Sequence, residues 1–215
     1  DDWLDMVNTE VLGHANMEVI LALGLTGPVS HILKEAKKIS DNPIFSLINE
    51  SSRGKTASLR LISSIWASGE ENGHYILNLN STELAFYAQL EKFWGMTILL
   101  DETTLQPGWD FSQAAYRLSK GSSRLRCNSD GSLKKRYFFS GSFVTSGEVS
   151  LISQSSPNLG MRARLIELTQ TWTDSAAHAQ RLEEKCRTCC ATAGPIVVEW
   201  LLENKEYVVQ QFTIC

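Results

Sequence analysis

Short apolar runs and longer amphipathic stretches alternate through the middle of this 215-residue chain. The runs are rich in Ile, Leu, Phe, Tyr and Val and end in Pro, Gly, Ser or acidic residues, as buried strands commonly do. They lie at residues 43–48, 75–79, 96–101, 137–139 with 142–145, and 165–168. Because helical stretches separate several of these runs, the pattern predicts an α/β fold with a parallel sheet flanked by helices.

The stretches between the runs carry apolar residues at helical spacing. Leu59, Ile62 and Trp66 share one helical face, and Ser81-Thr82-Glu83 is a capping sequence for a helix that continues to Leu90. A short helix is expected over 111–118, and two more over 176–192 and 196–203. We therefore divide the chain into an N-terminal helical segment (1–40), an α/β core (41–173) and a C-terminal helical segment (174–215).

Composition is that of an ordinary globular domain, with 43% hydrophobic and 20% charged residues. No run of about 18 apolar residues indicates a membrane span, and the first residues are unlike a signal peptide. The first residue is not Met, which suggests a fragment of a longer protein. Five cysteines, three of them clustered at 186–190, favour structural thiols in a reducing compartment, so we expect a cytoplasmic protein without membrane contact.

The stretch from Asn49 to Thr56 is one residue away from the phosphate-binding pattern G-x-x-x-x-G-K-[ST]. Asn49 replaces the first Gly, and we expect it to be tolerated because Asn adopts positive φ more readily than most residues. The residues expected to bind nucleotide in this loop are Asn49, Ser51, Ser52, Arg53, Gly54, Lys55 and Thr56. Lys55 would reach the outer phosphates, and the Thr56 hydroxyl would ligate Mg²⁺. The alternative is an ordinary Ser-rich turn.

A second motif supports the nucleotide interpretation. The apolar run 96–100 ends in Asp101-Glu102, and the carboxyl end of a parallel strand faces the ligand crevice. Asp101 would then hold Mg²⁺, and Glu102 would act as the catalytic base that polarises the attacking water. The alternative is a buried strand followed by a solvated acidic turn. ATP and Mg²⁺ are thus the expected cofactors.

Residues 124–136 hold the densest group of cations in a chain whose net charge is −4. Asp130-Gly131 lies between two alternating segments, which predicts a β-hairpin. The cations are Arg124, Arg126, Lys134, Lys135 and Arg136. They can contact a nucleic-acid backbone, or they can keep an edge strand from pairing with another chain.

These residues together resemble a family of helicase-like P-loop ATPases from phages, plasmids and integrative elements, catalogued as domain of unknown function 927. The resemblance covers roughly residues 10–203. Besides the loop and Leu99-Leu100-Asp101-Glu102, it rests on Tyr116-x-Leu118-x-x-Gly121, on Thr145-Ser146-Gly147-Glu148 and on Gly160-x-x-x-Arg164-Leu165-Ile166-Glu167. Two departures are Asn49 in the loop and the basic pair Lys134-Lys135.

The resemblance implies an ATP-dependent motor of a mobile-element replication protein, related in layout to superfamily 3 helicases. It implies single-stranded or forked DNA as the partner, contacted by the basic hairpin, and a homo-oligomer that could be a hexameric ring. Thr145 or Ser146 would sense the γ-phosphate, and Arg164 or Arg162 would act on the nucleotide of an adjacent subunit. For Arg164 the alternative is a surface ion pair with Glu167 or Glu148.

Two other functions remain open at the level of sequence. A degenerate or regulatory nucleotide-binding switch without unwinding activity is the main alternative, because Asn49 departs from the loop pattern. A small-molecule kinase would need an arginine-rich lid beside an acceptor pocket, and the sequence does not reveal one.

Overall fold

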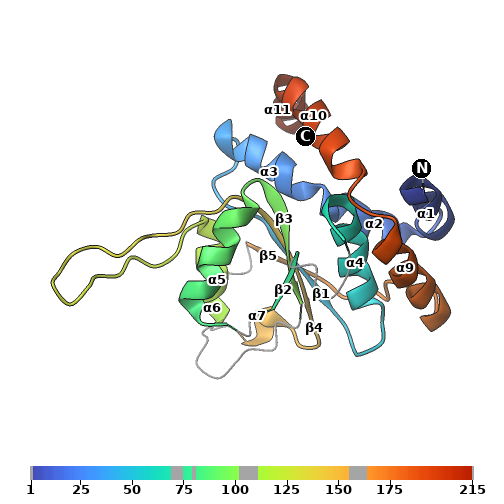
Figure 1. The fold of residues 1–215 in the computed structure, drawn as a ribbon, viewed down its shortest axis with the longest axis horizontal. Helices are drawn as coiled ribbons and strands as arrows, with labels where there is room; N and C mark the ends of the chain where they lie inside the picture. The colour runs from blue at the N-terminus through green and yellow to red at the C-terminus, as the bar shows by residue number, and fades with distance from the viewer. Residues whose placement is uncertain (1, 69–74, 79–80, 102–110, 155–163, 215) are drawn as a thin grey trace.

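The computed structural model describes residues 2–68, 75–78, 81–101, 111–154 and 164–214, which form a parallel sheet between two layers of helices (Figure 1). The strands are β1 (Ile44–Ile48), β2 (Ile76–Asn78), β3 (Met96–Asp101), β4 (Gly141–Gly147) and β5 (Leu165–Leu168). The helices are α1 (Asp2–Glu10), α2 (Ala15–Gly24), α3 (Thr26–Glu35), α4 (Lys55–Trp66), α5 (Glu83–Leu90), the 3₁₀ turn η1 (Glu91–Phe93), α6 (Phe111–Lys120), α7 (Leu151–Gln154), α9 (Ala176–Thr188), α10 (Ala193–Glu203) and α11 (Lys205–Ile214).

The five strands are ordered β2-β3-β4-β1-β5, and every neighbouring pair is parallel. The predicted α/β class is therefore confirmed. β1 lies between β4 and β5, with Ile44 opposite both Phe143 and Leu165. Because all strands run the same way, the residues that follow β1, β3 and β4 emerge at one edge of the sheet.

Side chains alternate between two buried clusters, one on each face of the sheet. Leu47, Leu99 and Val144 point to the face covered by α1, α2, α4 and α9. Ile48, Leu100 and Phe143 point to the other face, which α5 and α6 cover. Both faces are thus covered, as is usual for an all-parallel sheet with near-continuous apolar strands.

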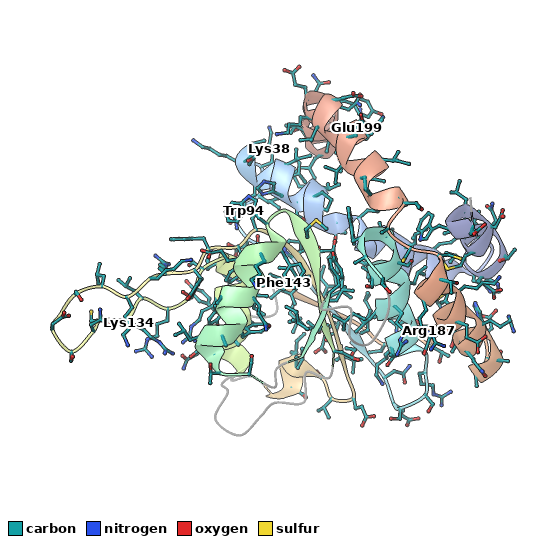
Figure 2. The ribbon with its side chains drawn as sticks, in the orientation of Figure 1. Lys38, Trp94, Lys134, Phe143, Arg187 and Glu199 are labelled. Atoms are coloured by element: carbon teal, nitrogen blue, oxygen red, sulfur yellow. The ribbon has the colours of Figure 1, made fainter. Side chains whose placement is uncertain are left out.

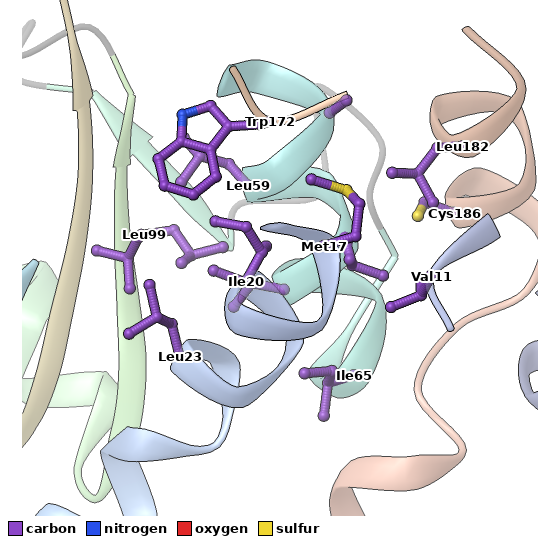
Figure 3. Close-up of a cluster of buried hydrophobic side chains, with 14 of the residues drawn as sticks. Val11, Met17, Ile20, Leu23, Leu59, Ile65, Leu99, Trp172, Leu182 and Cys186 are labelled. Carbon is purple, nitrogen blue, oxygen red and sulfur yellow. The ribbon is translucent and has the colours of Figure 1, made fainter. Parts of the chain in front are cut away.

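The first cluster joins residues that lie far apart in the chain. Figure 3 shows Ile20 of α2, Leu59 of α4 and Leu99 of β3 directed toward one another, with Trp172 above them. The N-terminal helices therefore belong to the same core as the sheet and α4. A buried hydrogen bond from Trp3 Nε1 to Ser64 Oγ (3.0 Å) links α1 to α4.

α3 lies against β3 and β4, and Thr97 of β3 binds both the beginning of α3 and the end of α2. The Thr97 hydroxyl accepts from the Gly27 N–H at 2.9 Å and donates to the Gly24 carbonyl oxygen at 2.7 Å.

Among the described residues no single helix has the length and apolar composition to cross a membrane. α2 and α3 together have that length and composition, but they are bent by 44° relative to each other.

Two expected elements differ from the structure. The helix predicted over 176–192 ends at Thr188, and a further helix, α11, follows α10 within the segment 174–215 that was predicted to be helical without separate bounds for it. The aromatic run 137–139 is not a strand: only Phe138 forms an isolated bridge, with Ser122. Phe139 is instead buried in the second cluster and stacks on Tyr87, so its apolar character serves packing.

Candidate functional site

The loop between β1 and α4 has the backbone geometry of an anion-binding loop. Gly54 is the N-cap of α4 and has φ 82°, and Ser52 has φ 62°. Such turns direct backbone N–H groups toward a common point. The first N–H groups of α4 and the positive end of its dipole lie at the same place, which favours an anion.

Asn49 does not have the backbone role that we predicted for it. The positive φ values in the loop fall on Ser52 and Gly54 and not on Asn49. Its side chain acts instead, because Nδ2 donates to the Gln170 carbonyl oxygen at 2.8 Å and Oδ1 accepts from the Glu50 N–H at 2.8 Å. Asn49 therefore ties the beginning of the loop to the segment that follows β5.

Lys55 lies over this loop. Its Nζ donates to the carbonyl oxygens of Asn49 (2.5 Å) and Glu50 (2.7 Å). The next residue, Thr56, is exposed at the beginning of α4. Ser51 donates to the Glu148 carboxylate at 2.5 Å, which places a carboxylate from beyond β4 beside the loop.

Asp101 and Ser146 meet at the same edge of the sheet. Leu100 of β3 lies opposite Thr145 of β4, so the next residue of each strand projects on the α4 face. Ser146 Oγ donates to Asp101 Oδ1 at 2.5 Å. The Asp101 carboxylate, the Ser146 hydroxyl and the Thr56 hydroxyl are oxygen atoms that can act as metal ligands, and oxygen ligands are the ones that Mg²⁺ prefers.

Thr145 is not part of this group, contrary to the expectation that it could contact nucleotide. It projects on the opposite face from Ser146, is fully buried, and its hydroxyl donates to Ser46 Oγ at 2.9 Å. This bond joins β4 to β1. Of the two candidate phosphate sensors, the structure brings only Ser146 to the site.

The loop and the two strand ends border a cleft of about 690 Å³. A cleft of this size is in the range of small-molecule sites. Its lining residues come from the loop, from α4, from the ends of β3 and β4, and from α9: they are Ser51, Ser52, Gly54, Lys55, Thr56, Ala57, Asp101, Ser146, Gly147, Glu148, Ala176, Ala179, Gln180 and Glu183. Arg53 is not among them; it is exposed and pairs with Glu50 at 3.4 Å.

The α9 residues of this cleft were missed by the sequence analysis. Ala176, Ala179, Gln180 and Glu183 carry no recognised motif, and their helix was assigned to a separate C-terminal segment. Their spacing of three, four and seven residues, which places them on one helical face, is the only signal that could have grouped them.

The segment that follows β5 supports the loop from behind. The Trp172 N–H donates to the Arg53 carbonyl oxygen at 3.1 Å, and Thr173 packs against Gly54. A Cβ on Gly54 would lie 2.6 Å from Thr173 Oγ1 and 3.0 Å from its backbone N. The loop is thus held by backbone contacts as well as by Asn49.

Arg164 lies at the end of the sheet where the strands begin, opposite to the end where the cleft lies. It precedes β5, and its Nε donates to Asp41 Oδ2 at 2.9 Å while its guanidinium lies 5.3 Å from the centre of the Tyr116 ring. The ion pair that we considered with Glu167 or Glu148 is therefore replaced by one with Asp41. Lys120 contacts the same carboxylate at 2.6 Å.

Burial alone would raise the pKa of Asp41, but the hydrogen bonds and charges of Lys120 and Arg164 outweigh it and hold this pKa below its ordinary value. Asp41 is thus a carboxylate that joins Arg164 to α6.

Residues 122–138, which we call the basic arm, project away from the sheet (Figure 1), and Lys134 lies on this projection (Figure 2). The predicted hairpin is present as an antiparallel excursion with a turn at 128–131, but its two sides are paired through isolated bridges, Ser122–Phe138 and Cys127–Leu133, and not through continuous strands. The Lys134 N–H also donates to the Arg126 carbonyl oxygen at 2.8 Å. A regular strand ladder is absent from this arm.

The cations of the arm differ in their partners. Arg126 pairs with Glu83 of α5 at 2.9 Å, and Lys135 pairs with Glu91 at 2.5 Å. Arg136 donates to Ser122 Oγ at 2.7 Å. Arg124 and Lys134 are exposed and have no ion pair within the described part of the chain.

His14, Asp174 and His178 form a cluster at the beginning of α9. His14 Nδ1 lies 2.6 Å from Asp174 Oδ2, and the His14 and His178 rings lie 4.8 Å apart. His178 is buried, and its Nε2 must carry the hydrogen because it faces the Glu10 carbonyl oxygen at 2.9 Å. The cluster joins α2 to the beginning of α9.

Two predicted site residues, Glu102 and Arg162, lie outside the described residues. The remaining predicted residues divide into two groups. Seven of them line one cleft: Ser51, Ser52, Gly54, Lys55, Thr56, Asp101 and Ser146. Asn49 and Arg53 belong to the same loop but do not line the cleft, and Thr145, Arg164 and the basic arm are also absent from its lining.

The five-stranded parallel sheet flanked by helices is the fold of a P-loop NTPase core. The chain belongs to the family described as "Domain of unknown function (DUF927)", which matches residues 1–137. The solved structure entitled "SCCmec type IV Cch - active helicase" is similar over 99% of this chain, with a TM-score of 0.87 and 25% sequence identity. The chain spans 39% of the length of that protein.

A second structure, an inhibitor-bound JCV helicase, is similar over 99% of this chain and 59% of its own, with a TM-score of 0.45 and 15% identity. None of the curated proteins matches the chain. The chain thus shares its fold with part of a protein that is described as an active helicase.

Proposed function

We propose that this domain is the ATP-hydrolysing motor of a mobile-element replication helicase that acts on DNA. The observation that carries the proposal is the convergence of an anion-binding loop, a lysine and an oxygen-donor set on one cleft. The similarity to a structure described as an active helicase supports the same function.

Each residue of the cleft has a role in this proposal. The N–H groups of the loop and Lys55 bind the phosphates of ATP and neutralise charge that develops on the γ-phosphate. Thr56 and Asp101 hold Mg²⁺, which supplies further charge neutralisation when bound. Ser146 orients the Asp101 carboxylate through its hydrogen bond. Glu102, next in the sequence, is the proposed base that orients the attacking water.

ATP turnover with and without single-stranded DNA tests the proposal. The Lys55→Ala variant should lose turnover and bind nucleotide weakly, because Lys55 is the lysine of the cleft. Lys38→Ala is the matched control, since Lys38 is exposed and lies just after α3, outside the cleft. Wild-type turnover in Lys55→Ala would rule out hydrolysis at this cleft.

The same measurement separates the motor from a nucleotide-binding switch. A motor should show DNA-stimulated turnover together with displacement of one strand from a forked duplex. Turnover that DNA does not stimulate, without strand displacement, would favour the switch.

The basic arm is the proposed contact with the DNA backbone. Arg124, Arg126, Lys134, Lys135 and Arg136 all lie on this projection, and the chain as a whole is acidic. Lys134, labelled in Figure 2, is exposed near the outer part of the arm. Because Glu83 and Glu91 already hold Arg126 and Lys135, we expect Lys134 and Arg124 to contribute more to phosphate binding than those two.

A salt titration of DNA binding tests this assignment. Lys134→Ala should weaken binding whatever the DNA sequence and reduce the slope of log K against log salt by about one. The double variant Lys134→Ala/Lys135→Ala should reduce it by less than two, because Lys135 has a carboxylate partner. Unchanged affinity and slope would leave edge protection as the role of these charges.

Arg164 is the proposed finger toward an adjacent subunit of a homo-oligomer, which could be a hexameric ring. β1 has five residues, so its first and last residues lie about 13 Å apart at about 3.3 Å per residue. Arg164 lies beside the first end and the nucleotide loop follows the second. Arg164 therefore cannot serve the cleft of its own chain without a large rearrangement.

Complementation tests this arrangement. In a mixture of the two variants, a Lys55→Ala chain still supplies an intact Arg164, and an Arg164→Ala chain still supplies an intact cleft. Where these two meet, one complete site can form, so turnover should rise above that of either variant alone. Turnover equal to the sum of the two separate variants would contradict a role of Arg164 in a neighbouring subunit.

A further inference from the structure

The cleft extends beyond the phosphate loop along one face of α9. Ala176, Ala179, Gln180 and Glu183 line this part, at positions i, i+3, i+4 and i+7 of the helix. The opposite wall is the loop and the beginning of α4. A ligand whose phosphates occupy the loop therefore has room to extend toward a helix face that is partly apolar and partly polar.

The chemistry of this face fits a planar base with an exocyclic amino group. The two alanines leave a shallow apolar surface on which a ring can lie. Gln180 Nε2 donates to Glu184 at 3.0 Å, which leaves the Gln180 amide oxygen as the group that can accept a hydrogen bond from a ligand. The Glu183 carboxylate is a second acceptor, held 3.6 Å from Arg60 of α4.

We propose that this face of α9 binds the base of the nucleotide and that Gln180 and Glu183 select adenine over guanine. Adenine carries an amino group, a hydrogen-bond donor, at the position where guanine carries a carbonyl oxygen, an acceptor. The Gln180 amide oxygen and the Glu183 carboxylate are both acceptors, so they can bind the amino group of adenine and would repel the carbonyl oxygen of guanine. The inference rests on the proposed nucleotide site, which it extends by naming the base subsite.

The wall is fixed before ligand binds. Ser175 caps α9 by accepting from the His178 N–H, and Lys185 and Arg181 pair with Glu10 of α1. Glu183 is held by α4 through Arg60. A wall braced from two neighbouring helices loses little freedom on binding, so its acceptors can discriminate between bases.

Binding of ATP, GTP and inorganic tripolyphosphate to the whole chain, each with Mg²⁺, tests the proposal. The wild type should bind ATP about tenfold more tightly than GTP. Ala179→Leu fills the surface on which the base lies and should weaken ATP about tenfold, while tripolyphosphate binds as to the wild type. Ala177→Leu is the matched control, because Ala177 is exposed and lies outside the cleft, and it should bind all three ligands normally.

Gln180→Ala provides the second variant and should bring the ATP and GTP affinities close together without changing that for tripolyphosphate. Retained tripolyphosphate binding shows that each variant is folded. Wild-type ATP affinity and selectivity in both Ala179→Leu and Gln180→Ala would overturn the base subsite and leave the phosphate site standing. Absence of both ATP and tripolyphosphate binding to the wild type would instead overturn the nucleotide site itself, and the subsite with it.

Discussion

Replacement of Gly54 by Ala is the sharpest test of how the loop is held. Gly54 has φ 82°, and a side chain there costs about 1–2 kcal/mol through backbone strain alone. The new Cβ would also lie 2.6 Å from Thr173 Oγ1, 2.8 Å from its Cγ2 and 3.0 Å from its backbone N. Such crowding in a packed site typically adds about 1–3 kcal/mol, so we expect a loss of about 2–5 kcal/mol in the free energy of unfolding.

Gly131→Ala separates the two contributions. Gly131, in the turn of the basic arm, has φ 83°, and a Cβ there would meet nothing within 4 Å. The Gly131→Ala variant should lose about 1–2 kcal/mol at most in the free energy of unfolding, because only backbone strain applies. Urea unfolding followed by far-ultraviolet circular dichroism measures both variants.

Thr173→Ala should partly rescue Gly54→Ala, because it removes the two side-chain atoms that the new Cβ would meet. A coupling free energy of about 1 kcal/mol or more between these substitutions is the expected result of the double-mutant cycle. Equal destabilisation by Gly54→Ala and Gly131→Ala, with no coupling to Thr173, would refute the close packing of the loop against the segment after β5.

Two further predictions concern stability. Burial alone would raise the pKa of Glu10, but Lys185 and Arg181 outweigh it and hold this pKa below its ordinary value. The contribution of Glu10 to stability is therefore present above the unfolded pKa and is lost as pH falls through the folded pKa. Glu10→Gln should therefore be less stable than the wild type near neutral pH, and its free energy of unfolding should fall less between about pH 7 and pH 3. Urea titrations across this range measure the difference, and a pH profile unchanged from that of the wild type would contradict the ion pairs of Glu10. Trp3→Phe removes the buried hydrogen bond to Ser64 and should lower the free energy of unfolding by about 1 kcal/mol or more. Trp94→Phe, at an exposed position, should lower it by less. Equal effects of the two substitutions in thermal or urea unfolding would argue against the Trp3–Ser64 bond.

Local patterns were sufficient to predict most of the fold. The strand runs and the capped helix at Thr82 depend on neighbours within a few residues, and the Thr82 cap is present with its bond from the Ala85 N–H. The aromatic run 137–139 misled the prediction because β-propensity largely measures burial. Phe139 is buried by stacking on Tyr87, which satisfies its apolar character without a strand.

The site was predictable only where a motif marks it. The loop and Asp101 follow strands directly, so their chemistry can be recognised from sequence spacing. The α9 face and the Arg164–Asp41 pair depend on contacts between distant residues, 123 positions apart in the latter case. The choice between Thr145 and Ser146 required the register of β4 against β3, because adjacent residues of a strand face opposite ways.

The burial of Trp172 gives the molecule an optical reporter of its own nucleotide loop. Its indole is almost fully buried over Leu59, and its Nε1 has no hydrogen-bond partner among the described residues. Its backbone N–H is bonded to Arg53, so a displacement of the loop is transmitted directly to the residue that carries the fluorophore. An indole in such an apolar surrounding should emit at short wavelength and shift to the red when the loop moves and admits water. A chain in which the other tryptophans are replaced by phenylalanine would therefore follow ligand entry in real time without an attached dye.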